Sequence, residues 1–272
     1  MPVQRRAFAW MTGQEPTNNT IWFEQPLNER VRTYLRLEFL FKRLRHHRGD
    51  ASYWGRRAAV GALLDIFLLL GRSDLKGDIT KELGEQHAHL RRLEARPGVN
   101  DDRLTDVLQK IDHAIHSIQG LSTQFAGAAL RNNDFLVSIA NRIAIPGGTT
   151  GFDLPNFELW LRRPLEESAR DLDAWCADIG AFERAIDLDL DLIRGSAVPR
   201  TVIAQDGIHV QSLDGPRQML RIGVAAQQRV HPEISAGKHR FTVRFMETRE
   251  TSSRSHQVRE NIEFQLACCG IG

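Results

Sequence analysis

The chain of 272 residues has few cysteines and no long apolar run. Cys176 stands alone and Cys268-Cys269 are neighbours, so no spaced set exists for a disulfide framework or a zinc site. Because a bond between adjacent cysteines is strained, packing explains this pair better than redox chemistry, and we expect reduced thiols. The longest apolar run, residues 66–70, is far below the roughly 20 residues that cross a bilayer. No secretory apolar segment follows the first residues, so these absences predict a cytoplasmic protein without membrane insertion.

Motifs for catalysis and for cofactors are also missing. Residues 237–239 read Gly-Lys-His and lack the glycine spacing of a phosphate-binding loop. His113 and His116 share one helix face, but no carboxylate or cysteine pattern completes a metal site around them. The sequence therefore shows no catalytic motif, and we expect no metal and no cofactor. An enzyme with a cleft between its domains would need a polar constellation that the sequence does not disclose, so it is the least favoured alternative.

Helical periodicity dominates the first two thirds of the chain. After a flexible tail over residues 1–20, Ile21–Gln25 is strand-like, and Asn28 is placed to cap a long helix whose broad apolar face includes Phe39. Further helices are expected over about 54–70, 75–95, 101–118, 123–144 (as a pair), 155–162 and 164–197. The glycine-rich stretch 145–151 predicts a turn. Four tryptophans lie within this apolar periodicity and are expected in the core or at a subunit interface: Trp22, Trp54, Trp160 and Trp175.

Beyond residue 197 the apolar period changes to two. Strands at 201–205 and 208–211 flank Asp206-Gly207, which favours a two-residue hairpin turn. Three more strands are expected at 220–224, 240–245 and 261–266. The predicted fold class is α+β, an N-terminal helical domain followed by a smaller antiparallel β-sheet domain that residues 21–25 could also join. The expected domains are a flexible tail (1–20), a strand joining the β domain (21–26), a helical domain (27–197) and a β domain (198–269).

Charge is unevenly distributed although 36 Lys and Arg nearly balance 34 Asp and Glu. Residues 29–57 hold nine basic against three acidic side chains, residues 166–191 hold nine acidic against two basic, and residues 200–249 hold eight basic against four acidic. Most such clusters of like charge lie on solvent-exposed faces and have no binding role. A basic face could bind phosphate backbones, which leaves nucleic-acid binding by residues 29–57 as an alternative. Because the total charge is near zero and no nucleic-acid motif is present, we expect no nucleic-acid partner.

Several ordered sequence blocks resemble one family. The segment Phe23-Glu24-Gln25-Pro26-Leu27-Asn28-Glu29-Arg30, continuing to Leu35-Arg36-Leu37-Glu38-Phe39, is similar to the N-terminal block of the ZapD family of bacterial Z-ring-associated proteins. Later blocks that match are Ile145-Pro146-Gly147-Gly148, Phe152-Asp153-Leu154-Pro155, Trp160-Leu161, Asp191-Leu192-Ile193-Arg194, Pro232-Glu233-Ile234-Ser235, Lys238, Arg240-Phe241, Arg244-Phe245 and Phe264–Cys269. Together the blocks span about residues 21–269.

The resemblance implies a non-enzymatic homodimer with a helical and a β domain. Such a protein binds the C-terminal tail of the tubulin-like division protein FtsZ and cross-links its filaments at the midcell ring. A two-fold dimer with one site per subunit can hold two filaments, so bundling needs no catalytic group. Because the tail combines carboxylates with apolar side chains, its site should pair Arg or Lys with an exposed apolar groove.

Matching the family blocks to this chain gives five candidate tail-binding residues. Arg36 is the first candidate and Arg240 the second. Arg72 follows an apolar run at a position where the family tends to be basic, and Lys238 and Arg244 add charge around Arg240.

Two features limit this assignment. Arg36 could instead brace its own domain by pairing with Glu38 or Asp153. The stretch 131–135 is less basic than its family counterpart, and Glu158 is acidic where the family is not. An acidic side chain repels a tail carboxylate unless an arginine lies between them, so both places are excluded from the predicted contact set.

Overall fold

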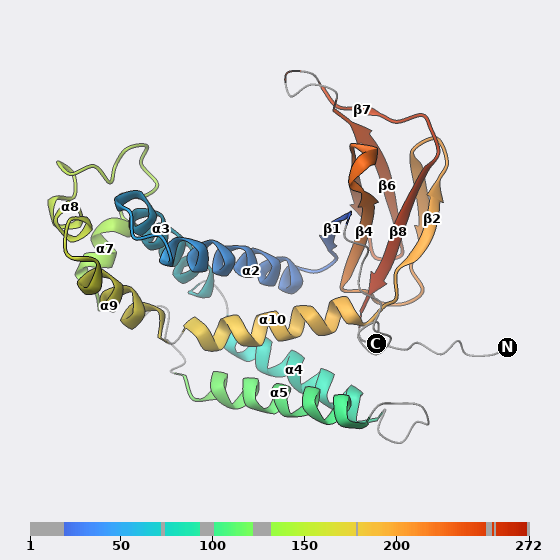
Figure 1. Ribbon diagram of the computed structural model, residues 1–272. Coiled ribbons are helices and arrows are strands. Elements are labelled where there is room, and N and C mark those ends of the chain that lie inside the picture. Colours follow the sequence, from blue (N-terminus) through green and yellow to red (C-terminus); the bar gives the residue numbers. More distant parts are fainter. Residues whose placement is uncertain are drawn as a thin grey trace. The chain divides into compact units, whose positions relative to one another are not determined.

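The computed structural model describes residues 19–71, 74–92, 101–121, 132–177, 179–248, 252 and 254–270. The chain divides into two compact units. One unit, here called the β unit, comprises Met1–Arg32, Pro97–Arg103 and Leu190–Gly272, and the other, the helical unit, comprises Thr33–Arg96 and Leu104–Asp189. Helices precede antiparallel sheets along the chain, which confirms the predicted α+β class (Figure 1).

The described helices follow the predicted periodicity. They are α2 (Glu29–Arg48), α3 (Tyr53–Leu70), α4 (Leu75–Arg91), α5 (Asp101–Gln119), α7 (Asp134–Ala140), α8 (Pro155–Leu161), α9 (Leu165–Cys176) and α10 (Ile179–Gly195). The Ser52 side chain caps α3 by accepting a hydrogen bond from the Gly55 N–H. Inside the helical unit, the Gln86 amide of α4 donates to the Asp189 carboxylate of α10 over 2.5 Å, so a buried polar pair joins these two helices. None of the described helices is long and apolar enough to cross a membrane.

Three details of the helical prediction need correction. The single segment expected over 164–197 is two helices, because α9 ends at Cys176, where the Ala177 N–H bonds back only three residues to the Ala174 carbonyl. Phe39, which was expected on the apolar face, is 65% exposed. Trp54 is 72% exposed, which excludes the core position and leaves a subunit interface as the remaining expectation. Much of the helix pair predicted at 123–144 lies outside the described residues.

The predicted turn at 145–151 is confirmed. Gly147 has a φ of +73°, a conformation that glycine adopts without strain, and the Gly148 N–H donates to the Ile145 carbonyl over 2.8 Å.

The strands form two antiparallel sheets rather than one. They are β1 (Thr20–Pro26), β2 (Arg200–Ala204), β3 (Ile208–Ser212), β4 (Met219–Ala225), β5 (Val230–Ala236), β6 (Arg240–Glu247), β7 (His256–Gln257) and β8 (Ile262–Cys269). One sheet has the order β1-β4-β8-β2, and the other has the order β3-β6-β5 with β7 paired to β6. The strand expected near residues 21–25 is confirmed as β1, which pairs with β4 along its whole length.

The Asp206-Gly207 turn forms as predicted but connects strands of different sheets. Both residues have positive φ, and the Ile208 N–H donates to the Gln205 carbonyl over 2.8 Å. β2 then pairs with β8, whereas β3 pairs with β6. Glycine is required at 207, since a Cβ there would lie 2.2 Å from the carbonyl oxygen of Val258.

The two sheets share one apolar core. Its buried residues come from both sheets and from the segment before β8: Ala204, Leu220, Ile222, Val224, Phe241, Val243, Phe245, Val258, Ile262, Phe264 and Leu266. The rings of Phe245 and Phe264, one from each sheet, lie 5.0 Å apart between centroids. The β unit is therefore a small sandwich of two sheets around this core.

A charged cluster ties β1 into the β unit. Arg194, in the last turn of α10, donates two hydrogen bonds to the Glu24 carboxylate at 2.9 and 2.8 Å, and Arg221 of β4 donates a third at 3.0 Å. The Arg221 guanidinium also lies over the Trp22 ring, 4.6 Å from its centroid. Because the three charged side chains are each no more than 20% exposed, their interactions are only weakly screened by solvent.

Candidate functional site

Most basic side chains between residues 29 and 57 are engaged within the protein. Seven of them pair as follows: Arg32 with Glu29, Lys42 with Glu38, Arg43 with Asp65, Arg45 with Glu183, Arg48 with Asp173, Arg56 with Ser168, and Arg57 with Tyr53 and Thr149. Arg30 also has a partner. Arg36 is the exception, because its exposed side chain forms no hydrogen bond or ion pair with any described residue.

Arg36 lies beside an exposed aromatic side chain. Phe39 follows it by three residues on α2, which places both on one face of the helix. The alternative partners of Arg36 are occupied elsewhere, since Glu38 pairs with Lys42 at 3.1 Å and Asp153 pairs with Arg142 at 2.9 Å. Arg36 and Phe39, here called the helical patch, therefore offer a cation next to an apolar ring. Sequence reasoning missed Phe39 because its spacing also fits a core position.

A second basic surface lies on the outer face of β6. Phe241 and Phe245 are buried in the sandwich, so the alternation of the strand turns Arg240 and Arg244 outward, where both are exposed. Lys238 is exposed in the turn that connects β5 to β6. Three of the predicted residues are thus brought together by one hairpin.

Apolar side chains of β3 join this basic surface. Ile208 lies directly opposite Arg244 in the strand register, and Val210 lies opposite Thr242. Ile208 is 36% exposed and Val210 is 58% exposed, whereas the intervening His209 approaches the buried Phe264 ring at 5.5 Å between centroids. The apolar residues of β3 therefore face outward, against the usual pattern of a half-buried strand. We call Ile208, Val210, Arg240 and Arg244 the strand patch.

Cross-strand neighbours distinguish the two arginines of the strand patch. Arg244 lies opposite Glu233 of β5, so part of its charge is balanced within the sheet. Arg240 lies opposite Ser212 and has no carboxylate directly across from it among the described strands. Arg240 is therefore the stronger of the two as a ligand for an external carboxylate.

The remaining predicted positions fall outside these patches. Arg72 lies outside the described residues. Glu158 is held by its own unit, since it accepts hydrogen bonds from the Tyr53 hydroxyl at 2.5 Å and from Arg162 at 2.7 Å. The bond from Tyr53, then that from Arg162, and the nearby charge of Arg57 lower the pKa of the Glu158 carboxyl below its usual value. Arg162 and Arg57 thus lie beside the Glu158 carboxylate and offset its negative charge.

Burial disfavours the reactive thiolate form of all three cysteines. All are free, and burial raises the pKa of Cys176 to about 11, raises that of Cys268, and raises that of Cys269 to about 12. Among the residues that the structure describes, no group of three or more His, Cys, Asp and Glu side chains is placed to hold a metal ion.

We expect Cys269 of the folded protein to resist alkylation at pH 8. Only the thiolate reacts, and a raised pKa leaves a very small thiolate fraction until the pH approaches about 12. Labelling with iodoacetamide followed by mass spectrometry should show slow modification of the native chain and rapid modification of all three cysteines in guanidinium. Equal rates in the two states would contradict this assignment of a packing role.

Comparison with known proteins identifies the family. The model of the cell division protein family ZapD matches residues 35–244, more than half of the chain. A cell division protein ZapD of Methylococcus capsulatus is 38% identical over 253 residues, which cover 92% of this chain and 98% of that protein. That of Bordetella petrii is 36% identical over 252 residues, covering 92% and 99%. The resemblance seen in the sequence blocks is confirmed, and this chain belongs to the ZapD family of cell division proteins.

Proposed function

We propose that this protein is a non-enzymatic division factor that binds the C-terminal tail of FtsZ. As a homodimer in the cytoplasm, it would cross-link FtsZ filaments and support assembly of the midcell ring. Membership of the ZapD family supports a role in cell division. The single observation that carries the binding mechanism is the exposed Arg36, which pairs with no described residue, beside the exposed Phe39, in a segment where the other basic side chains are already engaged.

The chemistry of the helical patch suits a short acidic and apolar peptide. A guanidinium donates two parallel hydrogen bonds to one carboxylate, and the exposed Phe39 ring can bury an aliphatic side chain of the same peptide. Arg36 has no ion pair with the described part of the chain, so binding does not first have to break one there. The strand patch offers the same combination of cation and apolar side chain on the other unit.

Bivalency would turn weak tail binding into cross-linking. A filament displays many copies of one tail, so a dimer that is bound through one subunit meets further tails at a high effective concentration. Each individual site can then be weak while the assembly is stable. Exposed charge pairs also weaken as the screening length falls from about 10 Å at 0.1 M salt to about 3 Å at 1 M.

The proposal is tested by sedimentation of GTP-assembled FtsZ with and without its C-terminal tail. We expect this protein to pellet with intact filaments, to increase the pelleted fraction, and to stay in the supernatant with tail-less filaments. Binding of the isolated tail peptide, followed by fluorescence anisotropy, should weaken as salt is raised. Equal co-sedimentation with tail-less filaments, or none with either, would refute tail recognition.

The same ion pairs argue against the alternative that this protein binds nucleic acid. Phosphate-backbone binding needs several free cations along one surface, yet Arg43, Arg45 and Arg48 of α2 already pair with Asp65, Glu183 and Asp173. A gel shift with random duplex DNA at physiological salt separates the two functions, and we expect no complex.

A further inference from the structure

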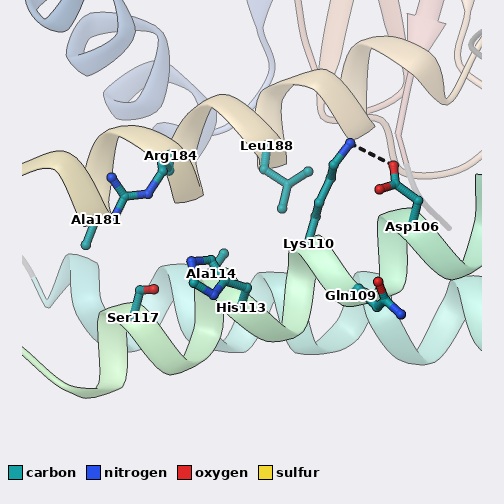
Figure 2. Close-up of a pocket in the computed structure, with 9 residues that line it drawn as sticks. All are labelled: Asp106, Gln109, Lys110, His113, Ala114, Ser117, Ala181, Arg184 and Leu188. Atoms are coloured by element: carbon teal, nitrogen blue, oxygen red, sulfur yellow. Dashed lines mark ion pairs between the residues drawn. The ribbon is translucent and has the colours of Figure 1, made fainter.

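A groove between α5 and α10 of the helical unit has no part in the proposed tail binding. Its volume is about 320 Å³, near the lower end of the range for small-molecule sites, and all of its lining residues belong to the helical unit (Figure 2). Neither the helical patch nor the strand patch contributes to it.

Helical spacing builds the two walls of the groove. Lys110, His113 and Ser117 of α5 follow one another at three- and four-residue intervals. Ala181, Arg184 and Leu188 of α10 repeat the same intervals on the other wall. Side chains at such spacing lie on one helix face, so both rows border the same hollow.

Hydrogen-bond donors gather toward one end of the groove. His113 and Ser117 of α5 border the space between the helices, and the Arg184 side chain runs along α10 on the opposite wall (Figure 2). None of these three side chains forms a hydrogen bond or an ion pair with a described residue. The Arg184 guanidinium lies close to its own helix at Gly180, where a Cβ would be 3.2 Å from Nη1. This end of the groove therefore carries an uncompensated cation and two further polar groups.

The other end of the groove is electrically balanced. Lys110 pairs with Asp106 at 2.7 Å, one helical turn away, so neither charge is left over for a ligand (Figure 2). Ala181 lies at the cationic end beyond Arg184, whereas Ala114 and Leu188 lie between the two ends (Figure 2). Ala114 and Ala181 are small and buried, and Leu188 is half-buried. Small side chains at these positions create the hollow, and its floor is apolar.

This arrangement fits an anion attached to a flat apolar body. A phosphate monoester carries about −1.5 to −2 charges and three acceptor oxygens, enough for the guanidinium, an imidazole N–H and a hydroxyl to donate together. A carboxylate offers only two oxygens and one charge. We propose that the groove binds a small phosphomonoester of the nucleoside monophosphate class, with its phosphate held by Arg184, His113 and Ser117 and its base lying against Ala114 and Leu188.

Calorimetric titration of the full chain tests this site with four probes: adenosine 5′-monophosphate, adenosine, inorganic phosphate and a phosphoserine peptide. We expect the nucleotide to bind at least about tenfold more tightly than adenosine or phosphate alone, because it engages both the cationic end and the apolar floor of the groove. Arg184→Gln should weaken nucleotide binding by about tenfold, and Ser117→Ala should weaken it less. Arg91→Gln, a change at an exposed arginine at the end of α4, is the matched control and should leave binding unchanged.

Several outcomes would overturn the proposal. They are nucleotide affinity no better than that of adenosine, no nucleotide binding tighter than about 1 mM, and an Arg184→Gln variant that binds like the parent. Tight binding of the phosphoserine peptide without nucleotide binding would assign the groove to a phosphorylated protein instead. Co-sedimentation of the Arg184→Gln variant with FtsZ should stay at the parental level, so failure of this site and failure of tail recognition are told apart.

Discussion

Reversing the charges of Arg36 and Arg240 together is expected to abolish binding of the FtsZ tail and bundling of filaments. A hydrogen bond to a charged group contributes about 1.5–3 kcal/mol. Each Arg→Glu change should therefore lower the affinity for the tail peptide by more than about tenfold at the patch that it alters. The introduced carboxylates also repel the acidic tail. Fluorescence anisotropy with a labelled tail peptide measures the affinity, and sedimentation measures bundling.

The charge reversals should leave the fold intact, because both side chains are exposed and neither has a partner among the described residues. Arg91→Glu is the matched control, since it reverses the charge of an exposed arginine on α4, outside both patches. Thermal unfolding of all variants should coincide within a few degrees. Parental affinity in the Arg36→Glu/Arg240→Glu variant would show that the tail binds elsewhere. If one of the two single variants keeps parental affinity, the patch that contains its substitution is not needed for tail binding.

The largest loss of stability is expected from Phe245→Ala. The Phe245 side chain is fully buried between the sheets, with its ring 5.0 Å from that of Phe264. Removing a buried phenylalanine ring costs about 3–5 kcal/mol through lost burial and the cavity that remains. Since a folded domain is stable by only about 5–15 kcal/mol, this change should bring the β unit close to unfolding.

Urea unfolding followed by near-ultraviolet circular dichroism measures this loss. Val210→Ala is the matched control, because Val210 lies on the neighbouring strand but is 58% exposed, and its loss should alter the free energy of unfolding by no more than about 0.5 kcal/mol. Two unfolding transitions are expected if the units unfold separately. In the Phe245→Ala variant, only the transition of the β unit should shift to a lower urea concentration. A Phe245→Ala variant as stable as the parent would mean that the two sheets do not share this core.

Local patterns were sufficient to predict most of the elements but not how the strands are paired. Apolar spacing and the Asp206-Gly207 turn act within a few residues, so the helices, the hairpin turn and the strand at β1 could be predicted. The separation of β2 and β3 into different sheets depends on β8 and β6, which lie much farther along the chain. β5 was not predicted because Pro232 interrupts its pattern, although proline is tolerated on such an edge strand.

The candidate site shows the same limit. Arg36 differs from Arg43 and Arg48 only because these two form ion pairs with Asp65 and Asp173, which are distant in sequence. Family resemblance could select Arg36, but no local pattern shows that its neighbours are neutralised. The sequence carried a weak signal for Ile208 and Val210 as surface residues. Both lie on one face of an alternating strand, and the other face has only His209 and Gln211.

The strand order of the larger sheet also fixes when the β unit can form during protein synthesis. β1 is made first, but its neighbour β4 begins about 190 residues later, and β4 in turn needs β8 at the end of the chain. β2 has β8 as its sole partner within that sheet. Contacts between such distant segments form slowly, because a long loop must close first. A ribosome that stopped near residue 260 would thus release a chain in which β2 and β4 still lack β8, whereas the helical unit would already be complete in sequence.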